Sequence, residues 1–315
     1  MWTFMLRRFV VLFVALLLVS VLAFLVPYMS GPEPAKMIMH ARVANLAIDP
    51  EAIDKMRVQL GLDRPLAVQY LDWLGKAVRG DFGFTFTDRL PVSAHIKQAI
   101  LVSISLALSA LALALSVALP LGVVGALKPG RGVDNFVMFL TQSLVAIPEY
   151  WIAPMATLVF AVHLHWLPSA GWLGPEYVVL PALALALRPM AYFTRVTRAA
   201  MIDVLEAPYI IAARSRGLGM GHTVLRHGVR NAMPPVITLF AMWLAGLIGG
   251  AVVIEVIFSI PGMGRLLYEA VVNKDIPVIQ GSIVVLVSFA VLISTLTDLV
   301  YVALNPAVRI ADAQA

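Results

Sequence analysis

The chain has 315 residues, of which 61% are hydrophobic and only 13% are charged, and its mean hydropathy is +0.90. This composition excludes a soluble globular domain and favours membrane-spanning helices of about 20 apolar residues. From the net charge of +5 we expect a lipid bilayer rather than nucleic acid as a partner. The absence of cysteine excludes a disulfide and a thiolate metal site.

Residues 1–30 predict a first transmembrane helix. Arg7 and Arg8 precede an apolar run from Phe9 to Val26. A cleaved signal peptide is the alternative, but the run is longer than a usual signal core, and Pro27-Tyr28-Met29 lacks the small residues of a cleavage site. We therefore expect a retained helix with its N-terminus in the cytoplasm, because basic residues flank the cytoplasmic side of membrane helices.

Residues 31–97 predict a soluble region outside the membrane. They carry mixed charges in helix-sized segments and are too polar to cross a bilayer, so they lie externally if the first helix crosses. Residues such as Trp73 and the stretch Gly80-Asp81-Phe82-Gly83 leave two interpretations open. They fold a small cap, which we favour, or they contact a substrate directly.

Residues 98–304 predict a five-helix core, and residues 305–315 a cytoplasmic tail. The apolar stretches fall at about 100–127, 136–164, 177–201, 236–258 and 278–304, which gives an all-α protein with six membrane helices. Basic residues gather at the N-terminus, at 128–131, in the polar loop before the fifth span and at Arg309, whereas the loop at 165–177 has none. This asymmetry places both ends of the chain in the cytoplasm.

Residues 202–235 form a long polar loop between the fourth and fifth spans. Glu206 and Pro208 are typical of a helix start, with an acid near the positive end and a proline where no N–H is needed. The glycines at 217, 219 and 221 should end this helix, and Thr223 is a candidate cap for a second one. The loop carries charge of one sign on Arg214, Arg216, Arg226 and Arg230. From the residues alone, two interpretations have equal weight. Either the arginines hold the loop at the membrane surface, or the loop is a surface that binds another protein.

Several motifs together resemble one known family. In the loop, the sequence Ala212-Ala213-Arg214 is followed by Gly217, and Leu225-Arg226-His227 leads through Arg230-Asn231-Ala232 to Pro235. Further matches lie at Leu60–Pro65, Gly249–Glu255, Pro261–Leu266 and Thr297–Tyr301. The chain resembles the permease subunits of ABC importers over nearly its whole length, and most of all the B-type subunit of the dipeptide/oligopeptide/nickel branch. One departure is Ala-Ala-Arg where the wider motif opens with Glu-Ala-Ala.

The resemblance implies the transmembrane domain of a type I importer in a bacterial inner (cytoplasmic) membrane. The implied partners are a second related permease in a heterodimer, two ABC ATPase subunits and an external substrate-binding protein. The polar loop would be the coupling loop that docks on an ATPase, through Glu206, Tyr209, Ala212, Ala213, Arg214, Gly217, Leu218, Arg226 and Asn231. The expected substrates are di- or oligopeptides. Nickel chelates, glutathione and oligosaccharides are alternatives within the branch, and a stand-alone secondary transporter is an alternative from another class.

We expect no enzyme, and no catalytic, cofactor or metal site in this chain. The glycines of the loop fail the phosphate-loop pattern, because Arg216 stands at its first glycine and His222 at its lysine. ATP hydrolysis therefore belongs to separate subunits. His163 and His165 do not share a helix face and are better explained as interfacial residues than as joint metal ligands.

Two charged residues fall inside the expected spans. Glu149 and Arg188 each lie about 13 residues from the cytoplasmic end of a span, which is roughly 20 Å at the helical rise. A lone charge at that depth is costly. We therefore expect the two side chains to face the bundle interior and to pair, either lining the translocation pathway or serving only structure.

Small residues and prolines mark the same region. Gly246, Gly249 and Gly250 would let the fifth span approach a neighbour, either within the chain or in a partner permease. We expect the third and fourth spans to be interrupted by Pro148, Pro154, Pro181 and Pro189. Carbonyls freed by a proline are tolerated where protein or a wet cavity covers them, so this pattern also points to a pathway.

Overall fold

The computed structural model describes residues 2–29, 36, 50–59 and 61–304, and the expectation for the tail at 305–315 lies outside them. Within the described residues the elements are helices, apart from one isolated bridge between Phe84 and Pro91. The expected all-α fold is therefore confirmed. The described residues divide into two units: those within 104–260 and 293–304 form unit 1, and those within 2–103 and 261–292 form unit 2.

Five helical stretches are long and apolar enough to span a membrane, by length and composition. They are Leu6–Met29, Val92–Leu127, Glu176–Leu205, Met220–Gly250 and Ile276–Thr297. A sixth span is present only if the bent pair Gly132–Ala146 and Glu149–His163 counts as one. Two of the long helices, α5 (Val92–Leu127) and α14 (Ile276–Leu304), contribute residues to both units.

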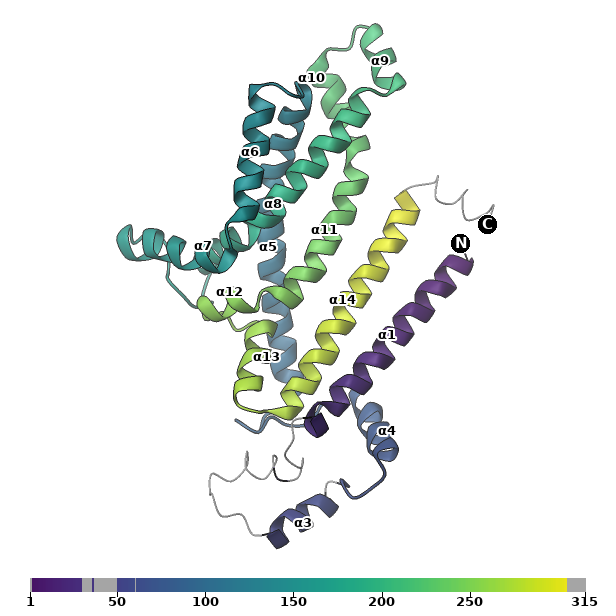
Figure 1. Ribbon diagram of the computed structural model, residues 1–315, viewed down its shortest axis with the longest axis vertical. Coiled ribbons are helices and arrows are strands. Elements are labelled where there is room, and N and C mark those ends of the chain that lie inside the picture. The colour runs from purple at the N-terminus through teal and green to yellow at the C-terminus, as the bar shows by residue number, and fades with distance from the viewer. Residues whose placement is uncertain (1, 30–35, 37–49, 60, 305–315) are drawn as a thin grey trace. The chain divides into compact units, whose positions relative to one another are not determined.

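Unit 1 is built around α8 (Glu176–Leu205), which packs against α6 (Gly132–Ala146), α7 (Glu149–Ala156) and α11 (Arg230–Gly250) (Figure 1). Small side chains allow this close packing, because they let helix backbones approach one another. The buried alanines of α8 include Ala182, Ala184, Ala186 and Ala191. The short helix α12 (Val252–Ile257) follows α11 and packs on α7 and α8.

The third apolar stretch is not one straight helix. It ends as α6 at Ala146, passes through an extended Ile147, and resumes after Pro148 as α7 and the π-helix η1 (Thr157–His163), bent by 92°. A residue before proline avoids the α conformation, and proline cannot donate to the preceding turn, so a break at Pro148 is the physical outcome. By contrast, Pro181 and Pro189 lie inside α8, which runs on through both of them. The expected interruption therefore occurs in the third stretch and not in the fourth.

Unit 2 joins the first helix to the polar segment that follows it. α4 (Leu66–Ala77) packs against α1 (Trp2–Met29) through Phe24, Tyr70 and Trp73, whose rings lie 5.5 to 6.5 Å apart. Ser20 and Tyr70 share a hydrogen bond of 2.7 Å between their hydroxyl oxygens. These aromatic residues hold α4 on α1. A further helix, α3 (Pro50–Gln59), precedes α4.

The core of unit 2 lies between the start of α5, the helix α13 (Met263–Val272) and the start of α14. Gly281 on α14 shows how close the packing is, since a Cβ there would stand 2.9 Å from the Ile96 side chain of α5. Gln280 also donates a hydrogen bond of 3.1 Å to the Ala23 carbonyl of α1. Both contacts tie α14 to its neighbours within this unit.

Candidate functional site

The polar loop of unit 1 contains α9 (Pro208–Ser215) as its first helix. Ala207 is the extended N-cap and Pro208 stands at the first helical position, where its missing N–H costs nothing. The helix stops at Gly217, which has a φ of +88°, because glycine adopts this left-handed conformation without a Cβ clash. The expected start near Glu206 and Pro208 and the expected stop at Gly217 are both confirmed as local structure.

α9 has a buried side and an exposed side. Ile210 and Ala213 are buried, whereas Tyr209 and Ile211 are 46% and 58% exposed. Arg214 and Arg216 are exposed as well. An apolar and cationic surface of this kind, left open at the end of a helical bundle, is typical of a contact with another protein. Figure 1 shows α9 and α10 joining the ends of α8 and α11.

The second half of the loop differs from the sequence expectation. α10 (Met220–Thr223) has Gly219 as its N-cap, and the chain continues without a break through the π-helix η2 (Val224–Val229) into α11. Thr223 is therefore not a helix cap, as we had expected; it is buried, and its hydroxyl donates to the Gly219 carbonyl at 3.1 Å. The helical backbone that begins at Met220 runs through Thr223 into η2, so Thr223 does not stand at a free helix start.

The structure places the remaining loop residues named above around the same segment. Glu206 is the exposed C-cap of α8, and Leu218 is half-buried just after Gly217. Ala212 and Arg226 are exposed, while the exposed Asn231 donates its side-chain amide to the His227 carbonyl at 2.8 Å. Of the nine residues, Ala213 is fully buried, so it holds α9 in place rather than presenting a surface.

A small apolar cluster seats this loop on the bundle. Its buried members come from four different elements: Ala126 of α5, Met201 of α8, Val224 of η2 and Ala232 of α11. The packing is close, since a Cβ at Gly228 would stand 3.0 Å from the Met201 methyl carbon. The loop is therefore in close contact with the adjoining parts of these helices.

Next to this cluster lies an ion pair that the sequence did not reveal. Arg198 of α8 donates from both Nε and Nη2 to the carboxylate of Asp134 on α6, with an Nη2–Oδ2 distance of 2.6 Å. The Gly130 N–H donates to the same carboxylate at 2.7 Å, and Asp134 is only 2% exposed. The two residues are 64 positions apart, so local sequence patterns carry no direct signal. The available hint was an acid in the first turn of α6 and an arginine near the end of α8.

Glu149 and Arg188 do not form the pair expected from the sequence. Glu149 is half-buried in the first turn of α7, directly after the 92° bend, and Arg188 is exposed in the middle of α8. Within the described residues no ion pair joins them. The depth argument fails for Glu149, because it assumed a straight helix from the cytoplasmic end.

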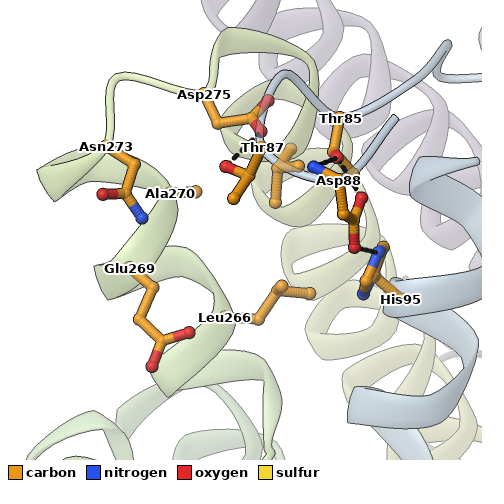
Figure 2. Close-up of a pocket in the computed structure, with 10 residues that line it drawn as sticks. Thr85, Thr87, Asp88, His95, Leu266, Glu269, Ala270, Asn273 and Asp275 are labelled. Atoms are coloured by element: carbon orange, nitrogen blue, oxygen red, sulfur yellow. Dashed lines mark hydrogen bonds and ion pairs between the residues drawn. The ribbon is translucent and has the colours of Figure 1, made fainter. Parts of the chain in front are cut away.

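Unit 2 contains a polar pocket of about 160 Å³ between the segment before α5 and the turn from α13 to α14 (Figure 2). Asp275 is 3% exposed and accepts hydrogen bonds from the Phe86 N–H at 2.8 Å and from the Thr87 hydroxyl at 3.5 Å. In Figure 2, Asp88 and His95 face one another at one side of the pocket, 2.9 Å apart. These contacts anchor the segment before α5 to the α13–α14 turn.

The Asp88 carboxylate is stabilised in its charged form. A hydrogen bond from the Thr85 hydroxyl, then one from the Leu90 N–H, and the nearby His95 imidazole lower the pKa of Asp88 below its usual range. Among the residues that the structure describes, no group of three or more histidines and carboxylates could hold a metal ion. The pocket therefore offers hydrogen bonds and charge rather than a metal site.

Comparison with known proteins identifies the family. Residues 118–310 match the family described as binding-protein-dependent transport system inner membrane component, and residues 1–107 match its N-terminal companion family. The chain belongs to this family. It is accordingly a multi-pass inner membrane permease subunit of an ABC importer and not an enzyme, and the family works with ATPase and substrate-binding partners.

Relatives and a solved structure agree with this assignment. The chain is 35% identical, over 309 residues, to the glutathione transport system permease protein GsiC of Escherichia coli (strain K12) and to its counterpart in Shigella flexneri serotype 5b. The alignment covers 98% of this chain and 99% of each relative. The structure of the MetNI methionine ABC transporter in an inward-facing conformation matches 67% of this chain and 96% of that chain, with a TM-score of 0.56 and 16% identity. That likeness supports the type I importer transmembrane fold.

Proposed function

We propose that this permease subunit forms half of the translocation pathway of an importer for di- or oligopeptides. The other half belongs to a second, related permease in a heterodimer. Two ABC ATPase subunits drive the cycle from the cytoplasmic side, and an external binding protein delivers the substrate. Six membrane helices, with both chain ends in the cytoplasm, complete the proposed arrangement.

The observation that carries the proposal is the geometry of α9. It is a short helix between α8 and α11, with Tyr209, Ile211 and two arginines exposed and with Ile210 and Ala213 buried. The exposed side fits an ATPase cleft, and the buried side passes the movement of the loop to the bundle. ATP binding can bias the bundle between inward-open and outward-open states only if the ATPases hold the loop differently in the two states.

The exposed residues of α8 support a role in the pathway. Arg188, Tyr192 and Ala199 are exposed along one side of α8. Arg188 is 12 residues from Glu176, the first residue of α8, or about 18 Å at the helical rise. A charged side chain facing hydrocarbon at that depth is unfavourable. The side of α8 with Arg188 therefore faces the aqueous pathway or the second permease, and Glu149 at the α6–α7 bend is proposed to lie beside the same pathway.

A second candidate substrate follows from the relatives. Both relatives named above are described as glutathione permeases, and glutathione is itself a modified tripeptide. Uptake of glutathione is thus an alternative within the same chemical class. Family membership also argues against a stand-alone secondary transporter, because an ABC importer depends on separate ATPase subunits.

The docking of α9 can be tested directly, because the natural chain contains no cysteine. A benzophenone attached to Tyr209→Cys should cross-link to the ATPase subunit in the assembled complex. Tyr268→Cys on α13 is the matched control, since Tyr268 is 50% exposed, close to the 46% of Tyr209, and lies on the proposed external side. Cross-linking at Tyr268→Cys and not at Tyr209→Cys would reverse the proposed orientation.

Transport itself is tested with the assembled complex in proteoliposomes. We expect uptake of a labelled dipeptide or of glutathione only with the binding protein outside and ATP available to the ATPases. Uptake by the purified chain alone, without a nucleotide-hydrolysing partner, would contradict the proposal.

A further inference from the structure

The ion pair between Asp134 and Arg198 lies where the polar loop joins the bundle. Arg198 stands seven residues before Leu205, the last residue of α8, which is about two helical turns. Asp134 stands in the first turn of α6, directly after the turn at 128–131. The pair therefore links the end of the helix that leads into the coupling loop with the beginning of the helix that leads to the bend at Pro148.

The chemistry of the pair favours a fixed geometry. A guanidinium that donates two parallel hydrogen bonds to one carboxylate holds both distance and orientation. Burial makes such a pair a poor source of stability, because apolar residues of similar volume serve equally well or better. What the ion pair adds to apolar packing is the restriction on how α6 can turn or slide against α8.

Two glycines of α5 bring a third helix into the same contact. A Cβ at Gly122 would stand 2.7 Å from the Thr197 Cβ and 2.8 Å from the Thr194 carbonyl oxygen, both on α8. A Cβ at Gly125 would stand 3.3 Å from Asp134 Oδ1. The backbone of α5 thus lies directly against the ion pair and against α8, and the start of α6 is enclosed on two sides.

The same part of the bundle contacts the loop itself. Ala126 of α5 and Met201 of α8 share a buried cluster with Val224, the first residue of the π-helix η2, and with Ala232 of α11. The loop therefore contacts α5 and α8, these two helices contact one another, and both contact the start of α6. The ion pair is the last contact of this series. Such a series moves as a single body when its outer end is displaced.

We propose that Asp134 and Arg198 are a positioning pair that transmits the movement of the coupling loop to α6, and through α6 to the bend before α7. This inference rests on the proposed function, since it needs a loop that an ATPase moves. The pair stays closed in every state of the cycle. Its role is to make α6 follow the loop, so that the bend beside Glu149 opens or closes the pathway in step with ATP.

The first test neutralises the pair in the assembled complex in proteoliposomes. For Asp134→Asn and for Arg198→Gln we expect uptake to fall about tenfold, within the range of typical allosteric couplings, while basal ATP hydrolysis and complex assembly persist. The double variant should transport as slowly as either single variant, because both remove the same interaction. Arg198→Lys should be intermediate, since it keeps the charge and loses the planar two-pronged donor.

Arg131→Gln is the matched control for the change of charge. Arg131 is exposed, lies three residues from Asp134, and takes part in no ion pair among the described residues. We expect its uptake to equal that of the unaltered complex. Normal uptake in Asp134→Asn would overturn the proposal, and so would a parallel loss of assembly, ATP hydrolysis and uptake, because the pair would then serve only folding.

The second test first compares two nucleotide states of the unaltered complex, and this comparison remains decisive if Asp134→Asn fails to fold. Spin labels at Val133→Cys on α6 and Ile211→Cys on α9, both exposed positions, report the distance between the two helices by electron double resonance, with the partner subunits freed of cysteine. We expect one distance in the nucleotide-free and the ATP-bound complex, and a broadened or shifted distribution in Asp134→Asn. A change of distance between the two states of the unaltered complex would show that α6 does not follow the loop.

These outcomes distinguish a failure of the proposed function from a failure of the positioning pair. The proposed function fails if the unaltered complex shows no ATP-dependent uptake or if Tyr209→Cys does not reach the ATPase. The positioning pair fails if that complex works and the Asp134→Asn complex works equally well.

Discussion

Gly217 offers the sharpest test of the coupling loop. Its φ of +88° lies in the left-handed region, and no atom of the described residues stands within 4 Å of an added Cβ. A side chain at Gly217 therefore meets no clash, and the cost is that of the backbone alone, about 1–2 kcal/mol for a residue with a Cβ. This energy shifts the population of the native turn by a factor of about 5–30.

We expect Gly217→Trp to uncouple transport. The strained turn changes the exit of the chain from α9, and the indole adds bulk at an exposed position directly after this helix. Uptake in proteoliposomes should fall at least tenfold, consistent with a coupling energy of about 1–3 kcal/mol. Assembly with the partner subunits and basal ATP hydrolysis should remain detectable, because the buried packing of α9 is untouched.

Gly221→Trp is the control for bulk without strain. Gly221 lies in α10, is exposed, has no atom of the described residues within 4 Å of an added Cβ, and has no positive φ. Gly217→Ala supplies the complementary control, with strain and little bulk, and should lie between Gly217→Trp and the unaltered complex. Normal uptake in Gly217→Trp would refute the docking argument, and equal defects at 217 and 221 would remove the role assigned to the turn.

Three other outcomes follow from the packing and the charges. Gly122→Ala should lower the unfolding free energy by about 1–3 kcal/mol through overpacking. Its control is Gly132→Ala, whose added Cβ meets no atom of the described residues within 4 Å and should change the unfolding free energy by less than about 0.5 kcal/mol. Thermal melting in detergent checks both. Because the folded pKa of Asp88 is lowered, its contribution to stability is complete above the unfolded value of about 3.9 and is lost as the pH falls below it. The melting difference between the natural chain and Asp88→Asn should therefore shrink on acidification. Glu149→Gln and Arg188→Gln should each reduce uptake at normal expression, and normal uptake in either would remove that residue from the pathway.

Local structure was the part most open to prediction from the sequence. The bounds of α9 follow from Pro208 at its first position and Gly217 after its last turn, and both signals act within a few residues. The long apolar helices follow from composition alone. The prediction that Thr223 caps a helix was wrong, because a threonine before a polar stretch is a cap only where the preceding backbone is not already helical.

Features that depend on distant residues could not be predicted in this way. The Asp134–Arg198 pair joins positions 64 apart, and the closeness of Gly122 to Thr197 depends on how α5 packs on α8. The bend at Pro148 was signalled by the proline, but its size of 92° could not be measured from the sequence. The error on Glu149 shows the consequence: a depth counted along a straight helix loses its meaning once the helix turns.

Two open surfaces of unit 1 support the proposed second permease. Gly246, Gly249 and Gly250 on α11 have no atom of the described residues within 4 Å of an added Cβ, although such glycines pack well only against a close helix. Arg188 on α8 is likewise exposed, and lipid is a poor environment for it. Tyr192 of α8 and Trp243 of α11 connect the two helices, with ring centroids 5.6 Å apart. In lipid, the glycines would have no closely packed neighbour and the arginine would face hydrocarbon. A partner helix against α11 would pack on the glycines, and an aqueous pathway along α8 would solvate the arginine. The proposed heterodimer would account for both features of this chain.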